Sequence, residues 1–272
     1  MPKDPLKKIT RELYGPKKIE RLIKDPEEFK TEDEVFDKHN MMVLFKLMNN
    51  GILQTLNYPV STGKEANVYE GSNPVGEKVA VKIFRTSTAT FKSFLEYIEG
   101  DPRFEKLEKG RWGVIFTWAK KEFRNLKEME KAGVKVPHPI HRIDNILVME
   151  MLTFQGRPAP QIRQIEAERE DWEEFWEEVI DGIKRLYQVG RIVHADLSEY
   201  NILYTERGLY FIDVAQGVSI EHPRGYEFLF RDVNNVVRFF QKKGVEIPYP
   251  EIFEDIMGRE AEVLRLIGLL PK

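Results

Sequence analysis

The spacing of apolar residues predicts a helical segment near the start of the chain and a helix-rich second half. In several stretches the apolar side chains recur three and four positions apart, which is the period of a helix that buries one face. Glycine follows several of these stretches, as expected where a helix ends. The predicted helices cover 35–50, 111–132, 162–189, 225–243 and 250–267.

After the first helix the pattern changes to short β-rich runs. Residues 67–70 and 78–84 predict two strands, and the Gly, Asn and Pro within 71–76 predict a hairpin turn between them. Residues 85–110 show no clear period, so we expect a flexible excursion with a short helix near 91–98. Further short strands are predicted at 140–143, 146–151, 202–204 and 209–212.

This order of elements predicts an α+β fold with two lobes and a cleft between them. The 272 residues are enough for one bilobal domain. We expect an N-terminal helical extension at 1–50, a β-rich N-lobe at 51–151 and a helical C-lobe at 152–272.

Composition excludes several classes of protein. No apolar run approaches the roughly 18 residues of a membrane span, so no membrane association is expected. Residues 1–10 carry three lysines and no apolar stretch, which argues against a secretory signal. The chain has no cysteine, which excludes disulfides and thiolate metal sites and fits a cytoplasmic location. Charged residues make up 32% of the chain at a net charge of −3, so both signs are interleaved, as in heat-adapted proteins.

Charge is uneven near the N-terminus. Residues 1–24 carry eight Lys or Arg against three acids, a net +5, and residues 25–37 carry seven acids against one lysine, a net −6. Each run suits a solvated helix face. The basic run also suits contact with RNA or another anionic partner, and both interpretations stay open.

The strongest chemical signal is His194-x-Asp196-x4-Asn201, followed by Asp213 after a short predicted hairpin. Phosphoryl transfer from ATP needs one aspartate that accepts or orients the proton of the attacking oxygen, a role that fits Asp196. It also needs oxygen ligands for Mg²⁺, or Mn²⁺ in its place, and Asn201 and Asp213 would supply them. Each residue alone would be an ordinary turn residue, but the full spacing favours the catalytic interpretation.

Lys82 ends an alternating apolar strand, where a lysine either projects into a cleft or extends to solvent. It follows the phosphate-loop candidates Ser61, Thr62, Gly63 and Lys64 in the order that kinases use. We therefore expect Lys82 to neutralise the ATP phosphates and Glu122, on the helix over 111–132, to hold it. Glu128 and Glu130 are alternatives on that helix.

The phosphate loop is the weakest match, because only one glycine of the kinase pattern is present and a plain β-turn would look the same. For adenine we expect the Glu150 carbonyl and the Leu152 amide as backbone partners, with Met149 behind them. Asp232 lies in an otherwise apolar helix and must be paired, either with the backbone of the catalytic loop or in a surface salt bridge.

Five motifs in order resemble the RIO atypical protein kinases, and the first resembles the archaeal-type RIO1 subfamily rather than RIO2. They are STGKEANVY at 61–69, VAVKIFR at 79–85, WAKKEFRNL at 118–126, HADLSEYNILY at 194–204 and IDVAQGV at 212–218. The resemblance implies a trimmed bilobal protein-kinase fold, Mg-ATP as cofactor, and serine/threonine kinase activity with autophosphorylation. It also implies a role in small ribosomal subunit maturation, with the subunit precursor and its rRNA as partners.

Some family members are thought to act mainly as ATPases, with the metal-binding aspartate transiently phosphorylated; here that residue would be Asp213. Few residues separate Asp213 from the helix over 225–243, so no long activation loop is expected. The Ser- and Thr-rich stretch at 86–93 is a candidate for autophosphorylation or a lid.

Two other functions are consistent with parts of the pattern. Small-molecule phosphotransferases of the aminoglycoside or choline kinase type share the H-x-D-x4-N loop, but the STGKEANVY block argues against them. A nucleotide-binding scaffold without turnover is disfavoured by the complete set of Lys82, Asp196, Asn201 and Asp213. The sequence identifies no protein substrate and does not fix the oligomeric state, for which a monomer is the working expectation.

Overall fold

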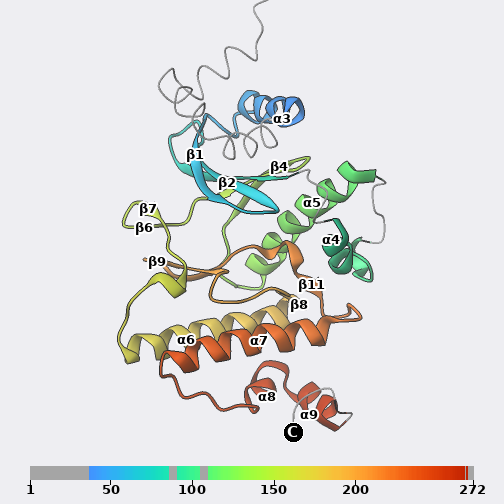
Figure 1. The fold of residues 1–272 in the computed structure, drawn as a ribbon, viewed down its shortest axis with the longest axis vertical. Coiled ribbons are helices and arrows are strands. Elements are labelled where there is room, and N and C mark those ends of the chain that lie inside the picture. The colour runs from blue at the N-terminus through green and yellow to red at the C-terminus, as the bar shows by residue number, and fades with distance from the viewer. Residues whose placement is uncertain (1–36, 86–90, 105–109, 267, 269–272) are drawn as a thin grey trace, which may run out of the picture. The chain divides into compact units, whose positions relative to one another are not determined.

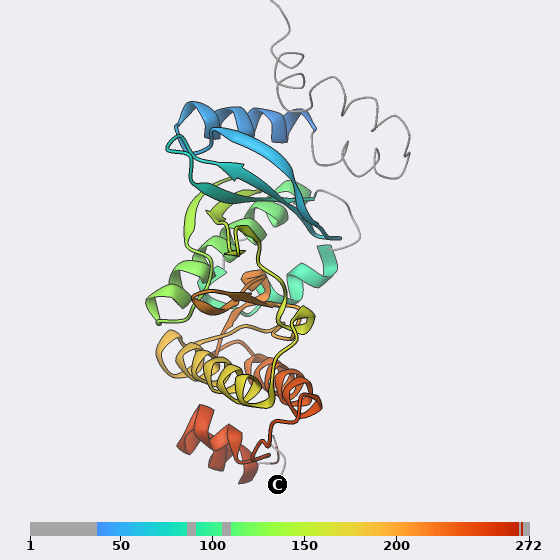
Figure 2. The same ribbon diagram turned by 90° about the vertical axis from the view of Figure 1, so that its left-hand side faces the viewer.

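A computed structural model describes residues 37–85, 91–104, 110–266 and 268. These residues form two compact units, drawn in Figure 1 and Figure 2. The β-rich unit contains the described residues up to 92, with 110–120 and 139–151. The helical unit contains 93–104, 121–138 and the described residues from 152 onward. The predicted contact of residues 1–24 with RNA lies outside the described residues, and the domain boundaries predicted from the sequence stay predictions.

An antiparallel sheet of five strands forms the centre of the β-rich unit, in the order β1-β2-β3-β5-β4. The strands are β1 (Thr55–Thr62), β2 (Ala66–Ser72), β3 (Lys78–Phe84), β4 (Pro139–Ile143) and β5 (Ile146–Glu150). The predicted turn between β2 and β3 is confirmed, because the Gly76 amide donates to the Asn73 carbonyl at 3.0 Å. Strand β3 lies in the middle of this sheet, between β2 and β5.

Helix α3 (Lys38–Asn49) packs its apolar face on this sheet and confirms the first predicted helix. Asp37 caps its start by accepting a hydrogen bond from the Asn40 amide at 2.8 Å. The Asn145 side-chain amide joins the helix to the sheet, because it donates to Asn40 Oδ1 and to the Phe84 carbonyl, both at 2.9 Å. The shared core comprises Met41, Val43, Leu44, Leu47, Leu53, Leu56, Tyr69, Val79, Val81, Ile83, Ile146 and Val148.

Strand β1 was not predicted, because its sequence lacks the alternation of a half-buried strand. Leu56 is its one buried residue, and the pairing with β2 is irregular between Leu56 and Ser61. Pro59 within it cannot donate a ladder hydrogen bond, which suits its place at the edge of the sheet. An exposed edge strand of this kind carries little apolar signal.

The helical unit is built around α6 and α7, which lie side by side in Figure 1 and Figure 2. Trp172 and Trp176 of α6 meet Phe240 of α7 with ring centroids 6.2 and 5.5 Å apart. The helices are α4 (Phe91–Ile98), α5 (Gly110–Lys131, shared with the β-rich unit), α6 (Arg169–Arg185), α7 (Gly225–Lys242), α8 (Ile252–Met257) and α9 (Arg259–Leu266). Short strand pairs complete it: β6 (Thr153–Phe154) with β7 (Arg157–Pro158), β8 (Ile192–Val193) with β11 (Val218–Ser219), and β9 (Ile202–Thr205) with β10 (Gly208–Phe211).

The helix predicted over 162–189 is shorter in the structure. A short 3₁₀ turn covers Ile162–Gln164, and α6 begins after Glu168, whose side chain and that of Asp171 form a capping box. A π-helical turn over Leu186–Gly190 ends it. The last predicted helix is likewise divided, because Gly258 takes a left-handed backbone (φ 62°) between α8 and α9.

Within the excursion predicted over 85–110, the structure describes residues 91–104. The short helix predicted near 91–98 is confirmed as α4, and a 3₁₀ turn at Pro102–Phe104 follows it. Phe94, Ile98 and Phe104 are buried, so apolar contacts fix this segment to the helical unit although its sequence shows no clear period.

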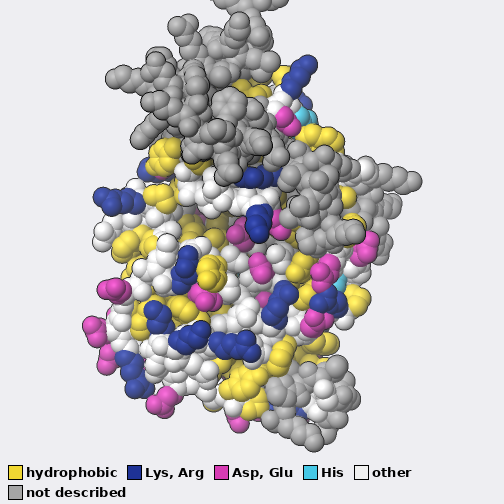
Figure 3. All heavy atoms as spheres, in the orientation of Figure 1, with side chains coloured by type: hydrophobic (Ala, Val, Ile, Leu, Met, Phe, Trp, Pro, Cys, Tyr) yellow, Lys and Arg dark blue, Asp and Glu magenta, His cyan; other side chains and the backbone are white. Residues whose placement is uncertain are grey.

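Two further expectations about the fold are confirmed. The architecture is α+β, and residues 214–224 alone join Asp213 to α7, so there is no room for a long activation loop. Positive and negative side chains are interspersed over the face in Figure 3. None of the described helices combines the length and the apolar character that crossing a membrane requires.

Candidate active site

The loop between β8 and β9 carries His194, Asp196 and Asn201, and α7 holds its backbone in place. The buried carboxylate of Asp232 accepts the Ala195 amide at 2.7 Å and the Leu197 amide at 2.9 Å. Arg231 donates to the Ala195 carbonyl from the same helix. Ala195 has a left-handed backbone (φ 63°), which a non-glycine residue adopts only when its surroundings hold it there. Of the two partners predicted for Asp232, the catalytic-loop backbone is the one observed.

Two side-chain amides hold the carboxylate of Asp196 from the same side. Asn201 Nδ2 and Gln216 Nε2 each donate to Asp196 Oδ2 at 3.2 Å. Burial raises the pKa of Asp196 above its ordinary value, and the negative charge of Asp213 adds to the rise, while Arg231 opposes it. With Oδ2 held by both amides, Oδ1 is the oxygen left to accept a proton.

The β9–β10 hairpin brings Asn201 and Asp213 to neighbouring strand ends, as the spacing predicted. The Ile212 amide donates to the Asn201 carbonyl at 3.0 Å, and Asp213 follows directly, exposed and with a left-handed backbone (φ 58°). His194 supports this junction from the catalytic loop, since its Nε2 donates to the Ile212 carbonyl at 3.0 Å. Burial lowers the pKa of His194 to about 4, so the ring is neutral at physiological pH.

The donor set fits a hard divalent cation. The Asn201 side-chain amide donates to the Asp196 carbonyl at 2.8 Å as well as to its carboxylate, which fixes the amide and leaves Asn201 Oδ1 as a ligand. Asp213 adds an exposed carboxylate. No cluster of three His, Cys, Asp or Glu side chains suited to a metal occurs among the described residues. Mg²⁺ does not need one, because it keeps several waters and takes one or two protein oxygens beside phosphate.

Lys82 lies on the central strand β3, opposite Val68 of β2 and Leu147 of β5. Only 5% of the residue is exposed, and its Nζ lies 5.1 Å from the centroid of the Phe84 ring. A side chain buried to this extent does not extend to solvent. Of the two alternatives for Lys82, extension to solvent is therefore wrong.

The four phosphate-loop candidates lie at the turn between β1 and β2. Ser61 and Thr62 end β1 opposite Val68 and Asn67, and all four candidates are exposed. The Gly63 amide donates to the Ala66 carbonyl at 2.9 Å, so this amide closes the turn. The contact of these residues with phosphate stays a prediction.

The predicted adenine contacts fall at the end of β5 and just beyond it. Met149 and Glu150 pair with Ala80 and Val79 of β3 in the β-rich unit. Leu152 belongs to the helical unit, where its carbonyl accepts the Ala159 amide at 3.0 Å. The roles assigned to their backbone groups stay predictions.

Glu122 is buried on α5 in the part of the helix that belongs to the helical unit. The alternatives on this helix have other partners, because Glu128 pairs with Arg103 at 2.6 Å and Glu130 contacts His138 at 2.8 Å. Since Lys82 belongs to the β-rich unit, its pairing with Glu122 stays a prediction.

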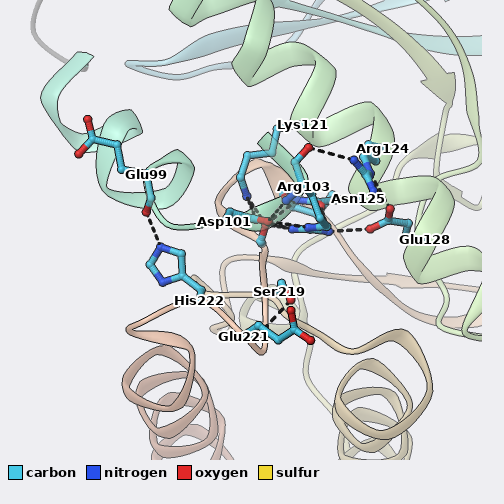
Figure 4. A network of polar contacts seen from close by, with 12 residues as sticks. Glu99, Asp101, Arg103, Lys121, Arg124, Asn125, Glu128, Ser219, Glu221 and His222 are labelled. Carbon is cyan, nitrogen blue, oxygen red and sulfur yellow. Dashed lines mark hydrogen bonds and ion pairs between the residues drawn. The ribbon is translucent and has the colours of Figure 1, made fainter. Parts of the chain in front are cut away.

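The sequence analysis missed several polar residues that lie in the loop after Asp213, contact it, or hold the residues that contact it. Figure 4 labels Asp101, Arg103, Lys121 and Asn125, which lie close together. Gln216 donates to the carboxylate of Asp196. The missed residues are Asp101, Arg103, Lys121, Asn125 and Gln216. Gln216 lies within the IDVAQGV block and could have been singled out there. Arg103 could not, because the carbonyl that it contacts, that of Gly217, lies 114 residues away in the sequence.

Comparison with known proteins identifies the family of the chain. The model of the RIO domain matches residues 67–252. The chain belongs to the RIO family of serine/threonine-protein kinases. Among RIO1-type relatives, the RIO-type serine/threonine-protein kinase Rio1 of Haloferax volcanii is 38% identical over 240 residues, covering 88% of this chain and 82% of the relative. Rio1 of Methanocaldococcus jannaschii is 36% identical over 249 residues, covering 92% and 84%.

The human serine/threonine-protein kinase RIO1 is 39% identical over 235 residues, and the match spans 85% of this chain but 41% of the human protein. A solved structure, the Rio2 kinase–ADP/Mg²⁺–phosphoaspartate complex from Chaetomium thermophilum, matches with a TM-score of 0.59 at 21% identity. That match covers 79% of this chain and 65% of the Rio2 chain. This likeness confirms the kinase-like fold of the RIO1-type chain.

Proposed function

We propose that this RIO1-type kinase transfers the γ-phosphoryl group of Mg-ATP to a serine or threonine hydroxyl, and to water when no hydroxyl is present. The observation that carries the proposal is the carboxylate of Asp196. It is fixed through one oxygen by Asn201 and Gln216, in a loop that Asp232 anchors and beside the strand end that carries Asp213. This is the arrangement that phosphoryl transfer requires of a base and its neighbouring ligands.

In the proposed reaction the acceptor oxygen attacks the γ-phosphorus while the bond from phosphorus to the β-phosphate oxygen breaks. The proton of the acceptor hydroxyl passes to Asp196 Oδ1, and ADP leaves. The pKa of Asp196, which burial raises, makes the carboxylate a stronger base than an exposed aspartate. When bound, Mg²⁺ would supply charge screening of the phosphates, held by Asn201 and Asp213. Lys82 would add a positive charge toward the phosphates.

Asp213 offers a second acceptor. Its exposed carboxylate could attack the γ-phosphorus itself, giving an acyl phosphate and ADP. Water would then cleave the acyl phosphate to phosphate and the free carboxylate, so the net reaction is ATP hydrolysis. The phosphoaspartate named for the Rio2 complex supports including this route. A role in maturation of the small ribosomal subunit, with its precursor and rRNA as cytoplasmic partners, also belongs to this proposal and rests on the RIO1 resemblance.

The chemistry of the protein-bound label separates these routes. The protein is incubated with γ-labelled Mg-ATP, quenched, and treated with hydroxylamine, which cleaves an acyl phosphate but not a phosphoserine. We expect hydroxylamine-sensitive label to disappear in Asp213→Asn, and hydroxylamine-resistant label to disappear in Asp196→Asn. Label found instead on added choline or an aminoglycoside would favour the small-molecule phosphotransferase, and absence of all label and of free phosphate would overturn the proposal.

A further inference from the structure

Three donors from outside the catalytic loop converge on the turn that follows Asp213, residues 214–217. Asn125 Nδ2 donates to the Val214 carbonyl at 2.7 Å and to the Gly217 carbonyl at 2.9 Å. The Gly217 carbonyl also accepts Arg103 Nη2 at 3.0 Å and Lys121 Nζ. The turn is therefore held by its backbone oxygens, which no side-chain substitution in the turn can remove.

Behind these contacts lies a buried group of charges. The side chains of Asp101 and Lys121 are fully buried, and that of Arg103 is 11% exposed. Arg103 forms a bidentate pair with Asp101, at 2.9 Å to Oδ1 and 2.7 Å to Oδ2, while its Nη1 reaches Asn125 and Glu128. Burial lowers the pKa of Lys121 to about 7, opposed by the negative charge of Asp101.

The segment that contributes Asp101 and Arg103 also contacts the later part of the connection between Asp213 and α7. We call residues 94–104 the support segment. The Tyr97 ring stacks on Phe228 with centroids 5.1 Å apart, and His222 Nε2 donates to the Glu99 carbonyl oxygen at 3.0 Å. Gly100 lies so close to Pro223 that a Cβ would be 2.9 Å from it. The support segment thus contacts both ends of the connection between Asp213 and α7.

We propose that the support segment, with Lys121 and Asn125 of α5, positions the turn at 214–217, and with it the preceding Asp213, for phosphoryl transfer. It does so as a permanent part of the fold, in place of a long activation loop. The turn follows Asp213 directly and contains Gln216, which donates to the catalytic carboxylate of Asp196. Arg103, Lys121 and Asn125 are therefore positioning residues for two groups of the active site. This inference rests on the proposed function.

The choice of contacts argues against a merely structural role. Burying charged side chains costs desolvation free energy, and apolar residues of similar volume usually stabilise a core at least as well. Here Arg103 and Lys121 donate to the Gly217 carbonyl, and Arg103 also holds Asn125, whose amide reaches the carbonyls of Val214 and Gly217. Apolar packing cannot supply these hydrogen bonds. Gly217 completes the arrangement, because a Cβ at this position would lie 3.0 Å from Asn125 Nδ2 and 3.1 Å from the Val214 carbonyl oxygen.

The test compares Arg103→Met and Asn125→Ala with the wild type. Asn125→Ala removes both bonds to the turn but keeps every charge, so it remains informative where Arg103→Met fails to fold. Arg103→Lys restores the charge and should partly rescue Arg103→Met. Lys135→Met is the matched control, because Lys135 also donates to a carbonyl and a carboxylate, those of Arg207 and Glu178, away from the turn.

Two readouts are needed. In the protein without nucleotide, we expect hydrogen exchange in the peptide covering 212–219 to speed up about tenfold in both test variants, with that of α7 unchanged. In turnover assays we expect kcat to fall about tenfold or more and the Mg²⁺ concentration for half-maximal rate to rise. A misplaced Asp213 would both slow phosphoryl transfer and weaken Mg²⁺ binding. Lys135→Met should change neither.

The outcomes distinguish this inference from the proposed function. If the wild type turns over Mg-ATP while both variants keep its Mg²⁺ dependence, kcat and local exchange, the support segment has no positioning role. Exchange that rises uniformly through α7 would also contradict it, by showing general destabilisation. If the wild type does not turn over ATP, the proposed function fails, and faster local exchange in the variants would still show that these residues hold the turn.

Discussion

Asp232 is the residue whose removal should disturb the catalytic loop most severely without touching a reacting group. It is 2% exposed and accepts two backbone amides, those of Ala195 and Leu197, on its two carboxylate oxygens. These bonds flank Asp196 and hold Ala195 in its left-handed conformation. Asp232→Ala would leave both amides buried without an acceptor.

The magnitude follows from these two bonds. A buried donor without a partner costs about 1–3 kcal/mol, so two give about 2–6 kcal/mol. Part of this is offset because burying the carboxylate is itself costly: burial raises the pKa of Asp232, and the two backbone amides oppose that rise. We therefore expect Asp232→Ala to lower the free energy of unfolding by about 2–4 kcal/mol. Asp232→Asn keeps one acceptor oxygen and should cost about half as much.

Urea unfolding gives the free energy of unfolding, and turnover per folded molecule gives the effect on the loop. Asp181→Asn is the control, because Asp181 is an exposed carboxylate in an i,i+4 pair with Arg185 and should change stability by less than about 0.5 kcal/mol. We expect turnover in Asp232→Asn to fall about tenfold or more, since a displacement near 1 Å can cost that much. If Asp232→Ala unfolds within 0.5 kcal/mol of the wild type, roughly the error of such a measurement, the account of the loop is refuted.

Two further predictions concern pH. The pKa of His194 is about 4 in the folded protein and 6.5 for the free side chain. Between these two pH values the unfolded chain binds a proton that the folded protein does not. The free energy of unfolding should therefore fall by about 3 kcal/mol as the pH drops from 6.5 to 4. Urea midpoints measured across this range should show the slope in the wild type and a clearly smaller one in His194→Gln, and equal slopes would contradict the assignment. Gln216→Ala removes a donor that favours ionised Asp196, so the acidic limb of kcat/KM should move to higher pH and turnover should fall several-fold. An unmoved limb in the pH profile would show that Gln216 does not act through Asp196.

The parts of the site that are local in sequence could be predicted. The catalytic loop and the hairpin that leads to Asp213 have fixed spacing, and the structure brings Asp196 and Asn201 into contact as that spacing requires. The pairing of Asp232 with the loop was one of two open possibilities, because a buried carboxylate must be paired but its sequence does not say with what. The burial of Lys82 likewise depends on neighbouring strands that the apolar pattern does not specify.

The contacts of the support segment with the turn could not be predicted, for a physical reason. Arg103 acts on a backbone carbonyl more than a hundred residues away, and a carbonyl is present at every residue, so no side chain marks it as the target. The apolar residues Phe94, Ile98 and Phe104 are too few to give a clear period in so short a segment. Strand β1 was missed for the related reason that an exposed edge strand needs few apolar residues.

The most direct test of the central claim follows γ-labelled Mg-ATP in the wild type and in Asp196→Asn, with nucleotide binding measured on the same samples. We predict that the wild type releases labelled phosphate or transfers it to serine or threonine. In Asp196→Asn we predict that turnover falls by about a hundredfold or more while nucleotide binding is retained, because only the base is lost. Full turnover in Asp196→Asn, or nucleotide binding without any turnover in the wild type, would contradict the assignment of Asp196 as the catalytic base of a phosphotransferase.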